Sequence, residues 1–377
     1  EFKSFLLRSS SDDWVWAMLR DAVTQRIFVE HCSFGVQAYE PSITFINGEY
    51  YGIHNIREKY NEAYIESNYG VDPDNLDVLK GEAHFLQANE GDTEHYDAMF
   101  AYMLENDLSE SQHYEYILTQ MDILSYVDYV AAQLYCDNIA FMNNRRMWRE
   151  RTDDGIWRFL LNDTDKGFFN SNGNRFALFD EFDPLFPELI VNEDFKNLLA
   201  QRSASLMNIA FRAERAFPIV ETATDEIADE MPHHIERWSD LGGIPDIEFW
   251  NQEVIRIRNF ANDRVPNLRA HYLNSLELEG FYDLTTHVSL DSAGTILAQG
   301  VLIPPDSTSF TGQYFQNIPL TLQAIANPGY EFVEWVGAFE STDPTITVTL
   351  NSVDEITAVF EESVFKEGLH INEFMAS

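Results

Sequence analysis

The sequence is poor in basic residues. Its 377 residues contain 24 lysines and arginines against 63 aspartates and glutamates, which gives a formal net charge of −39. Such a chain repels nucleic acid and anionic membrane surfaces, so we expect neither as a partner. An acidic surface is also common in proteins from salty surroundings. If the ligand is a nucleotide phosphate, however, a divalent cation has to offset the repulsion locally.

Cysteines and long apolar runs are also scarce. Cys32 and Cys136 are the two cysteines, which allow at most one disulfide and exclude a disulfide framework. No apolar run approaches the roughly 18 residues that a membrane-spanning helix needs. The chain opens at EFKSFLLRSS without a methionine and stops within INEFMAS, so we interpret it as a fragment of a longer protein.

Several catalytic signatures are missing as well. The sequence has no HEXXH or GxSxG motif, so zinc-protease and serine-hydrolase chemistry have no support. A glycine-rich phosphate-binding loop is not visible either. Five histidines are not spaced as a set of metal ligands would be: His31, His54, His84, His95 and His113.

The pattern of the sequence changes near residue 280. Before it, strand and helix patterns mix: SITFI and YGIHNI flank an Asn-Gly turn, residues 11–30 predict one amphipathic helix, and helical periods dominate from 193 to 276. We therefore predict an α+β domain over residues 1–278, with a small mixed sheet and a helical lobe. Short alternating runs predict an all-β module over 279–363, and residues 364–377 begin a further unit.

The stretch LLNDTDKGFF, residues 160–169, places two aspartates after an apolar run that reads as a strand. If the strand continues, Asp163 and Asp165 point to the same face, because side chains two positions apart on a strand do so. Two carboxylates on one face suit Mg²⁺, which takes one or two carboxylates and keeps several waters. The alternative interpretation is an acidic turn that closes the strand.

Several segments together resemble the spore-coat CotH kinase family. They are FINGEYYGIHNIREKYNEAYIESNYGVDPDNLDVLKG, the NN…WR element at 143–149 and the DTDxGF element at 163–168, within about residues 1–270. The resemblance implies a divergent protein-kinase-like fold that binds ATP with magnesium and phosphorylates protein side chains. Residues 285–360 resemble a bacterial β-repeat of secreted surface proteins, and LHINEFMAS resembles the start of a lamin-tail-type domain. These companions imply an exported, extracellular or cell-surface bacterial protein.

The resemblance and kinase chemistry together assign a site. As metal ligands they indicate Asn144, Asp163 and Asp165. As nucleotide-binding residues they indicate Arg57, Glu58, Lys59 and Lys80, with Arg8 as a further candidate. Glu58 and Lys59 are adjacent in a strand and so cannot pair with each other. Lys80 is therefore a candidate partner of Glu58 or a ligand of the phosphates.

The position of the catalytic base departs from the family pattern. The family commonly has an aspartate shortly before the paired asparagines, and this sequence has Ala140 there, or Ile139 by the kinase spacing of five residues before Asn144. Neither side chain accepts a proton. Asp137 is the nearest carboxylate and is our candidate base. The sequence thus leaves open an active kinase using Mg-ATP on a surface or matrix protein, a pseudokinase or adhesion scaffold, and a Ca²⁺-dependent adhesion module.

Overall fold

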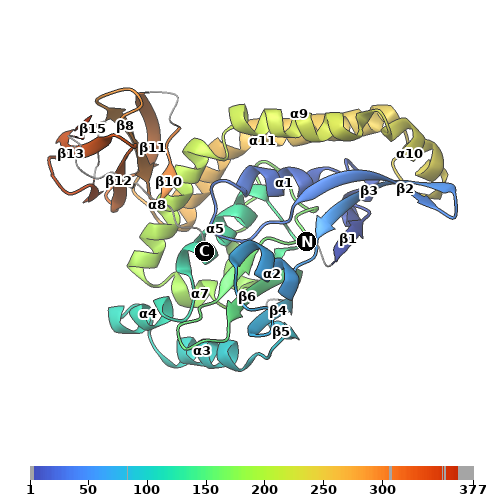
Figure 1. The fold of residues 1–377 in the computed structure, drawn as a ribbon, viewed down its shortest axis with the longest axis horizontal. Coiled ribbons are helices and arrows are strands. Elements are labelled where there is room, and N and C mark those ends of the chain that lie inside the picture. The colour runs from blue at the N-terminus through green and yellow to red at the C-terminus, as the bar shows by residue number, and fades with distance from the viewer. Residues whose placement is uncertain (1–3, 83, 305–307, 350, 352–353, 364–377) are drawn as a thin grey trace, which may run out of the picture. The chain divides into compact units, whose positions relative to one another are not determined.

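The computed structural model describes residues 4–82, 84–304, 308–349, 351 and 354–363 (Figure 1). The chain forms two compact units, Glu1–Leu278 and Glu279–Ser377. The first unit mixes helices with two sheets, and the described part of the second contains strands, so the predicted α+β class followed by an all-β region is confirmed. The expected lamin-tail-type segment lies outside the described residues.

The first sheet is built around the predicted hairpin. The strands β2 (Tyr39–Ile46) and β3 (Glu49–Glu58) pair through Asn47 and Gly48, which both have positive φ, as a two-residue turn of this twist requires. The hairpin prediction is therefore confirmed. The N-terminal strand β1 (Phe5–Arg8) pairs with the other side of β3, so the sheet order is β1-β3-β2.

The predicted continuous helix over residues 11–30 is wrong. The structure has a short 3-10 helix, η1 (Ser11–Val15), and a separate helix, α1 (Arg20–Phe28). The break follows from Asp13, whose buried carboxylate accepts the backbone N–H groups of Ala17, Leu19 and Arg20. A side chain that satisfies these donors competes with the helical hydrogen bonds, so the chain turns before α1 begins.

The second sheet is antiparallel and has the order β5-β4-β6-β7. Its strands are β4 (Leu76–Glu82), β5 (Phe85–Glu90), β6 (Arg145–Glu150) and β7 (Arg158–Leu160). The helix α2 (Glu62–Tyr69) precedes it and ends at Gly70, which has the left-handed conformation expected of a C-terminal glycine. Because β7 ends at Leu160, the expected strand does not reach Asp163.

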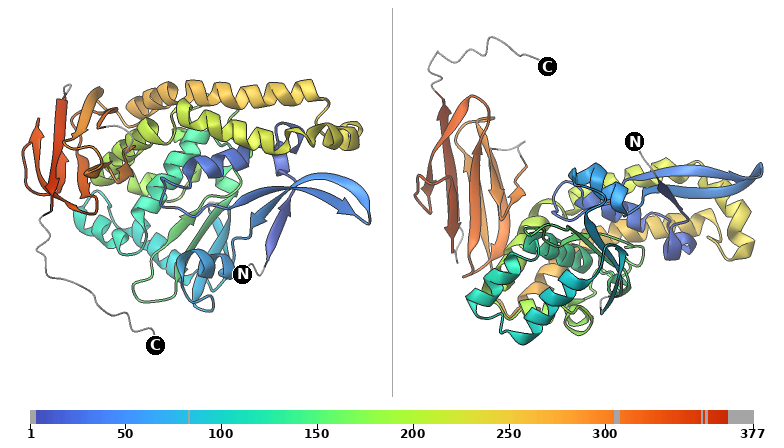
Figure 2. Two further views of the ribbon diagram at one scale, coloured as in Figure 1. Left: turned by 45° about the horizontal axis from the view of Figure 1, so that its top comes forward. Right: turned by 60° about the horizontal axis from the view of Figure 1, so that its bottom comes forward.

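Helices make up the rest of the first unit. Those between β5 and β6 are α3 (Glu94–Glu105), α4 (Ser111–Leu118), α5 (Ile123–Cys136) and the 3-10 helix η2 (Phe141–Asn143). Those after β7 are α6 (Phe176–Phe182), α7 (Phe186–Leu189), α8 (Glu193–Ile209), α9 (Ala213–Ala228), α10 (Met231–Trp238), the 3-10 helix η3 (Ser239–Leu241) and α11 (Ile247–Ser275). The predicted helical lobe is confirmed, and Figure 2 shows α9 and α11 side by side with α10 at one end of the pair.

Helix α10 docks on the hairpin through a buried histidine. His234 Nδ1 accepts the backbone N–H of Ile53 at 3.1 Å, and Trp238 Nε1 donates to the Tyr51 carbonyl at 2.8 Å. Burial, together with the nearby His54, lowers the pKa of His234 to about 4. The folded protein therefore holds this imidazole neutral at neutral pH.

Replacing His234 by asparagine is expected to flatten the acid dependence of stability. The unfolded chain takes up a proton below about pH 6.5, whereas folded His234 does so only near pH 4. The stability from this group is thus present above pH 6.5 and falls, by on the order of 2–3 kcal/mol, as the pH drops to 4. Asparagine Oδ1 keeps an acceptor for Ile53 without titrating. Urea unfolding from pH 4 to 8 measures this, and curves of equal slope for both proteins would contradict it. Burial, and next Arg215, also lower the pKa of His31 to about 4, which contributes equally to both proteins.

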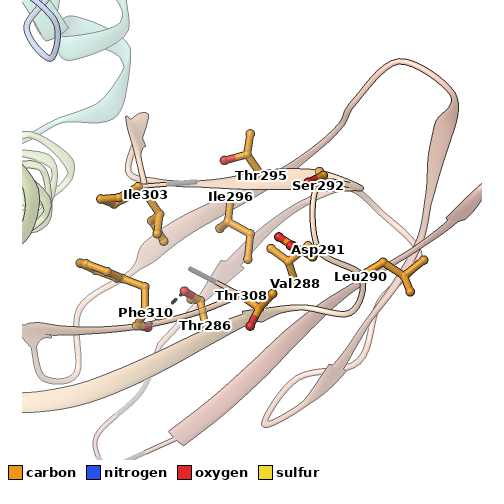
Figure 3. A pocket seen from close by; sticks show the side chains of 12 residues that line it. Thr286, Val288, Leu290, Asp291, Ser292, Thr295, Ile296, Ile303, Thr308 and Phe310 are labelled. Carbon is orange, nitrogen blue, oxygen red and sulfur yellow. Dashed lines mark hydrogen bonds between the residues drawn. The ribbon is translucent and has the colours of Figure 1, made fainter. Parts of the chain in front are cut away.

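The second unit contains two sheets of four strands in its described residues, with the orders β10-β9-β12-β14 and β11-β8-β15-β13. The strands are β8 (Phe281–Val288), β9 (Gly294–Ala298), β10 (Val301–Leu302), β11 (Ser309–Phe315), β12 (Leu320–Ala326), β13 (Tyr330–Gly337), β14 (Thr345–Val348) and β15 (Asp354–Glu362). Figure 3 shows a recess lined by Ile296, Ile303 and Phe310, among others. Its volume of about 20 Å³ has room for about one water molecule, so we assign it no ligand.

Two expectations about the whole chain can be checked on the described residues. Cys32 and Cys136 are both free thiols, so no disulfide joins them. None of the helices in the described part of the chain is long and apolar enough to span a membrane.

Candidate active site

The loop after β7 brings two carboxylates to one cation. Asp163 has a positive φ of 57°, which turns the chain away from the strand. As a result, the Arg8 Nη2 atom contacts Asp163 Oδ1 and lies 3.2 Å from Asp165 Oδ2. The side chain of Asp163 is 22 % exposed and that of Asp165 is 3 % exposed. A single positive charge at this point is therefore within reach of both carboxylates. The sequence analysis expected the two carboxylates on one face of a strand, whereas the structure brings them together in a loop.

The electrostatics of the pair reflect two acids that share one guanidinium. Burial, and next the neighbouring carboxylate of Asp163, raise the pKa of Asp165 to about 7. Although burial opposes it, the carboxylates of Asp21 and Asp163 raise the pKa of Arg8. Arg8 is thus charged, and additional positive charge at this position would favour the ionised form of Asp165.

A cleft of about 410 Å³ lies beside this loop. Residues that line it include Lys80, Gln87, Asn143, Asn144, Arg146 and Asn162. Lys80 comes from β4 and Arg146 from β6, while Asn162 directly precedes Asp163. Burial lowers the pKa of Arg146, and the nearby Tyr60 and Asp163 oppose this shift, so Arg146 lies within electrostatic range of the carboxylate pair. The lining also contains Glu82 and Arg145, and the guanidinium of Arg145 pairs with Asp183. Lys80 and Arg146 beside the amide side chains suit a phosphate group.

The connection between α5 and β6 is tied to the carboxylate loop by Asn138. Its buried Nδ2 donates to Gln133 Oε1 at 2.9 Å and to the Asp163 carbonyl at 3.3 Å, and its Oδ1 accepts the Ala140 N–H at 3.0 Å. These contacts hold residues 138–144 next to the loop that carries Asp163. Sequence reasoning did not single out Asn138, although it stands at the start of the asparagine-rich stretch.

Comparison with known families identifies the first unit. The model of the family described as CotH kinase protein matches residues 1–268, which include the carboxylate loop and the cleft. The chain belongs to the CotH kinase protein family. A model of the divergent InlB B-repeat domain matches residues 306–364, so the expected bacterial repeat is also confirmed. No curated protein matches the chain.

The CotH domain has no proton acceptor at the position where the sequence pattern expects one. Ala140 is half-buried and Ile139 is 47 % exposed, in the connection between α5 and η2. Asp137 is 2 % exposed, and its Oδ1 lies 2.8 Å from Arg175 Nε. Burial raises the pKa of Asp137, and Arg175 opposes this. The carboxylate points to Arg175 and Gly173 rather than to the cleft, so the geometry does not favour Asp137 as the base.

The predicted nucleotide-binding residues do not all meet. Lys80 lines the cleft, whereas Arg57 is buried and its Nη2 donates to Asp21 Oδ2 at 2.6 Å. Glu58 accepts the Ala38 N–H at 2.9 Å, and it lines a separate recess of about 20 Å³ with the exposed Lys59. No contact in the described structure pairs Glu58 with Lys80. Sequence reasoning missed two cleft-lining cations, Arg145 and Arg146, which directly follow the paired asparagines.

The residues present fit a divalent cation that needs few ligands from the protein. Among the described residues, no group of three or more histidine, cysteine, aspartate or glutamate side chains is placed to hold a metal. Mg²⁺ needs only one or two carboxylates, because it keeps several waters and binds substrate phosphates. The guanidinium of Arg8 stands where such a cation would contact both Asp163 and Asp165. Ca²⁺ takes about six to eight oxygen ligands and would need more of them from water.

Proposed function

We propose that the CotH domain binds a magnesium–ATP complex in the cleft and transfers its terminal phosphate to a side chain of a surface or matrix protein. The observation that carries this proposal is the cationic position shared by Asp163 and Asp165, beside a cleft with Lys80 and Arg146. The divergent kinase-like character of the fold belongs to the same proposal. The B-repeat supports an exported, extracellular or surface location.

Each side chain has a role that its position allows. Bound Mg²⁺ would neutralise the phosphates, and Asp163, Asp165 and Asn144 are the residues that would hold it. Lys80 and Arg146 offset the remaining negative charge of the phosphates. Arg8 neutralises the carboxylate pair in the absence of the metal.

Without a base, the rate of phosphoryl transfer is lower, but the transfer is not excluded. Transfer proceeds through a loose transition state in which positioning and charge neutralisation contribute most. The bond from the terminal phosphorus to the bridging oxygen breaks, and a bond to the acceptor hydroxyl forms. With Ala140 and Ile139 in place, the hydroxyl proton leaves to water or to the transferred phosphate.

A second candidate function is a pseudokinase or scaffold that binds nucleotide without transferring phosphate. It is favoured by one specific observation, that Asp137 is buried in an ion pair with Arg175. Incubation with labelled ATP and a protein acceptor separates the two, because the scaffold would bind nucleotide without incorporation of label.

Thermal unfolding in the presence of ligands tests the proposal. ATP with Mg²⁺ at about 100 times the dissociation constant is expected to stabilise the domain by about 2.7 kcal/mol, which corresponds to a rise in Tm of several degrees. ATP with a chelator should give a much smaller rise, because the phosphates would then lack their counter-charge. Stabilisation by Ca²⁺ alone, with no response to nucleotide, would overturn the proposal in favour of an adhesion module.

A further inference from the structure

We propose that Asp21, near the start of α1, is a positioning residue that holds the loop carrying Asp163 and Asp165 in the shape that binds a cation. This inference rests on the proposed function and assigns a role that neither the cleft nor the carboxylate pair reveals by itself. Asp21 does not line the cleft, and it is 4 % exposed.

The contacts of Asp21 fall on the residue between the two carboxylates. Asp21 Oδ1 accepts both the backbone N–H and the Oγ1–H of Thr164, each at 2.9 Å. Because Thr164 is joined directly to Asp163 and Asp165, fixing its amide and its hydroxyl fixes the orientation of the loop. Asp163 has a left-handed backbone that only surrounding structure can maintain at low cost. Asp21 supplies that restraint from 143 positions earlier in the chain.

Asp21 is itself held by the hairpin. Its Oδ2 accepts from Arg57 Nη2 at 2.6 Å, and both side chains are buried. Although burial opposes it, the guanidinium of Arg57, and next that of Arg8, lower the pKa of Asp21 to about 2. The carboxylate is therefore ionised and accepts hydrogen bonds without donating any. This assigns Arg57, which the sequence suggested as a nucleotide ligand, to supporting the loop through Asp21.

An asparagine at position 21 would keep the shape of the side chain but would not hold the loop of Asp163 and Asp165 in the same way. The carboxylate of Asp21 accepts hydrogen bonds with both oxygens, from Thr164 and from Arg57. Asparagine replaces one of these oxygens by an NH₂ donor, which would then face the donor of Thr164 or of Arg57. Groups that orient metal ligands typically change metal affinity about 10- to 100-fold when they are mutated. We therefore expect the Asp21→Asn protein to bind Mg²⁺ with ATP about 10- to 100-fold more weakly than the wild type.

A matched control separates positioning from general stability. Asp128 forms a buried ion pair with Arg202, with Oδ1 and Oδ2 at 2.7 and 2.8 Å from its nitrogens, between α5 and α8. Asp128→Asn removes the same charge from an equally buried arginine pair. Both variants are expected to lower Tm, since each leaves a buried guanidinium without its charged partner.

The experiment measures Tm and the calorimetric affinity for Mg²⁺ with ATP in the wild type, Asp21→Asn and Asp128→Asn. Affinity lost in Asp21→Asn and kept in Asp128→Asn supports positioning, whereas equal affinity in all three overturns it. If Asp21→Asn does not fold, two variants of Thr164 replace it. Thr164→Val removes the hydroxyl donor, and Thr164→Ser keeps it. Weaker binding in the valine variant than in the serine variant supports positioning. A wild type that binds neither Mg²⁺ nor ATP would instead overturn the proposed function, and with it this inference.

Discussion

Replacing Ala140 by aspartate is expected to raise the rate of phosphoryl transfer by about 10²- to 10⁴-fold, the usual contribution of a positioned general base. Position 140 is half-buried, follows the anchor Asn138 by two residues, and its carbonyl lies 3.4 Å from Asn144 Nδ2. A carboxylate there would start from a loop already tied to Asp163. Incorporation of labelled phosphate into an acceptor protein measures the change.

Ile139→Asp is the control for this gain. It adds the same charge one position earlier, on a side chain that is 47 % exposed. A larger gain from Ile139→Asp would place the missing base by the kinase spacing instead. Equal incorporation in the wild type and both variants would contradict the prediction, because proton transfer would then not limit the reaction. No incorporation in any of the three proteins would favour the scaffold interpretation.

Asp163→Asn is expected to weaken Mg²⁺-dependent nucleotide binding by more than about 100-fold, because it removes a proposed ligand rather than a group that only supports one. The fold should survive this change. Asp165 still pairs with Arg8, and the loss of a like charge nearby relieves part of the effect that raises the pKa of Asp165. Calorimetric titration with Mg²⁺ and ATP, together with the Tm of the unliganded protein, gives both quantities.

Asp12→Asn is the matched control for Asp163→Asn. The Asp12 side chain is 61 % exposed and pairs with Lys166 at 2.9 Å, whereas the backbone N–H of Asp12 donates to Asp165 Oδ2 at 2.9 Å. The variant therefore removes one side-chain charge close to the site and keeps this backbone hydrogen bond. Unchanged nucleotide binding in Asp12→Asn is expected. Similar losses in both variants would show that net charge, rather than a ligand at position 163, controls binding.

Local features of the fold were predictable from the sequence. The Asn47-Gly48 turn and the helix that ends at Gly70 depend on residues within one turn of the chain, where backbone preferences decide the structure. The broken helix before α1 was not predictable, because Asp13 looks like an ordinary helix-starting residue until its carboxylate is seen to accept three backbone N–H groups.

The candidate site was predictable in its chemistry but not in its partners. The pattern DTD identified two carboxylates that the fold does bring together, although a left-handed Asp163 does so in place of a longer strand. The contact between Arg8 and Asp163 joins residues 155 positions apart, and no local pattern encodes it. Arg57 was expected at the nucleotide, and the structure pairs its buried guanidinium with Asp21, a contact between positions 36 residues apart that no local pattern encodes.

The position of Arg8 has a consequence for how the protein survives without its cation. Two carboxylates that share a site without a counter-charge disfavour each other's ionised form. Here Arg8, at the end of the first strand, places one positive charge beside both carboxylates, which offsets part of their repulsion. Under the proposed function, the chain folds with Arg8 beside both carboxylates and binds the nucleotide only once the ion is present.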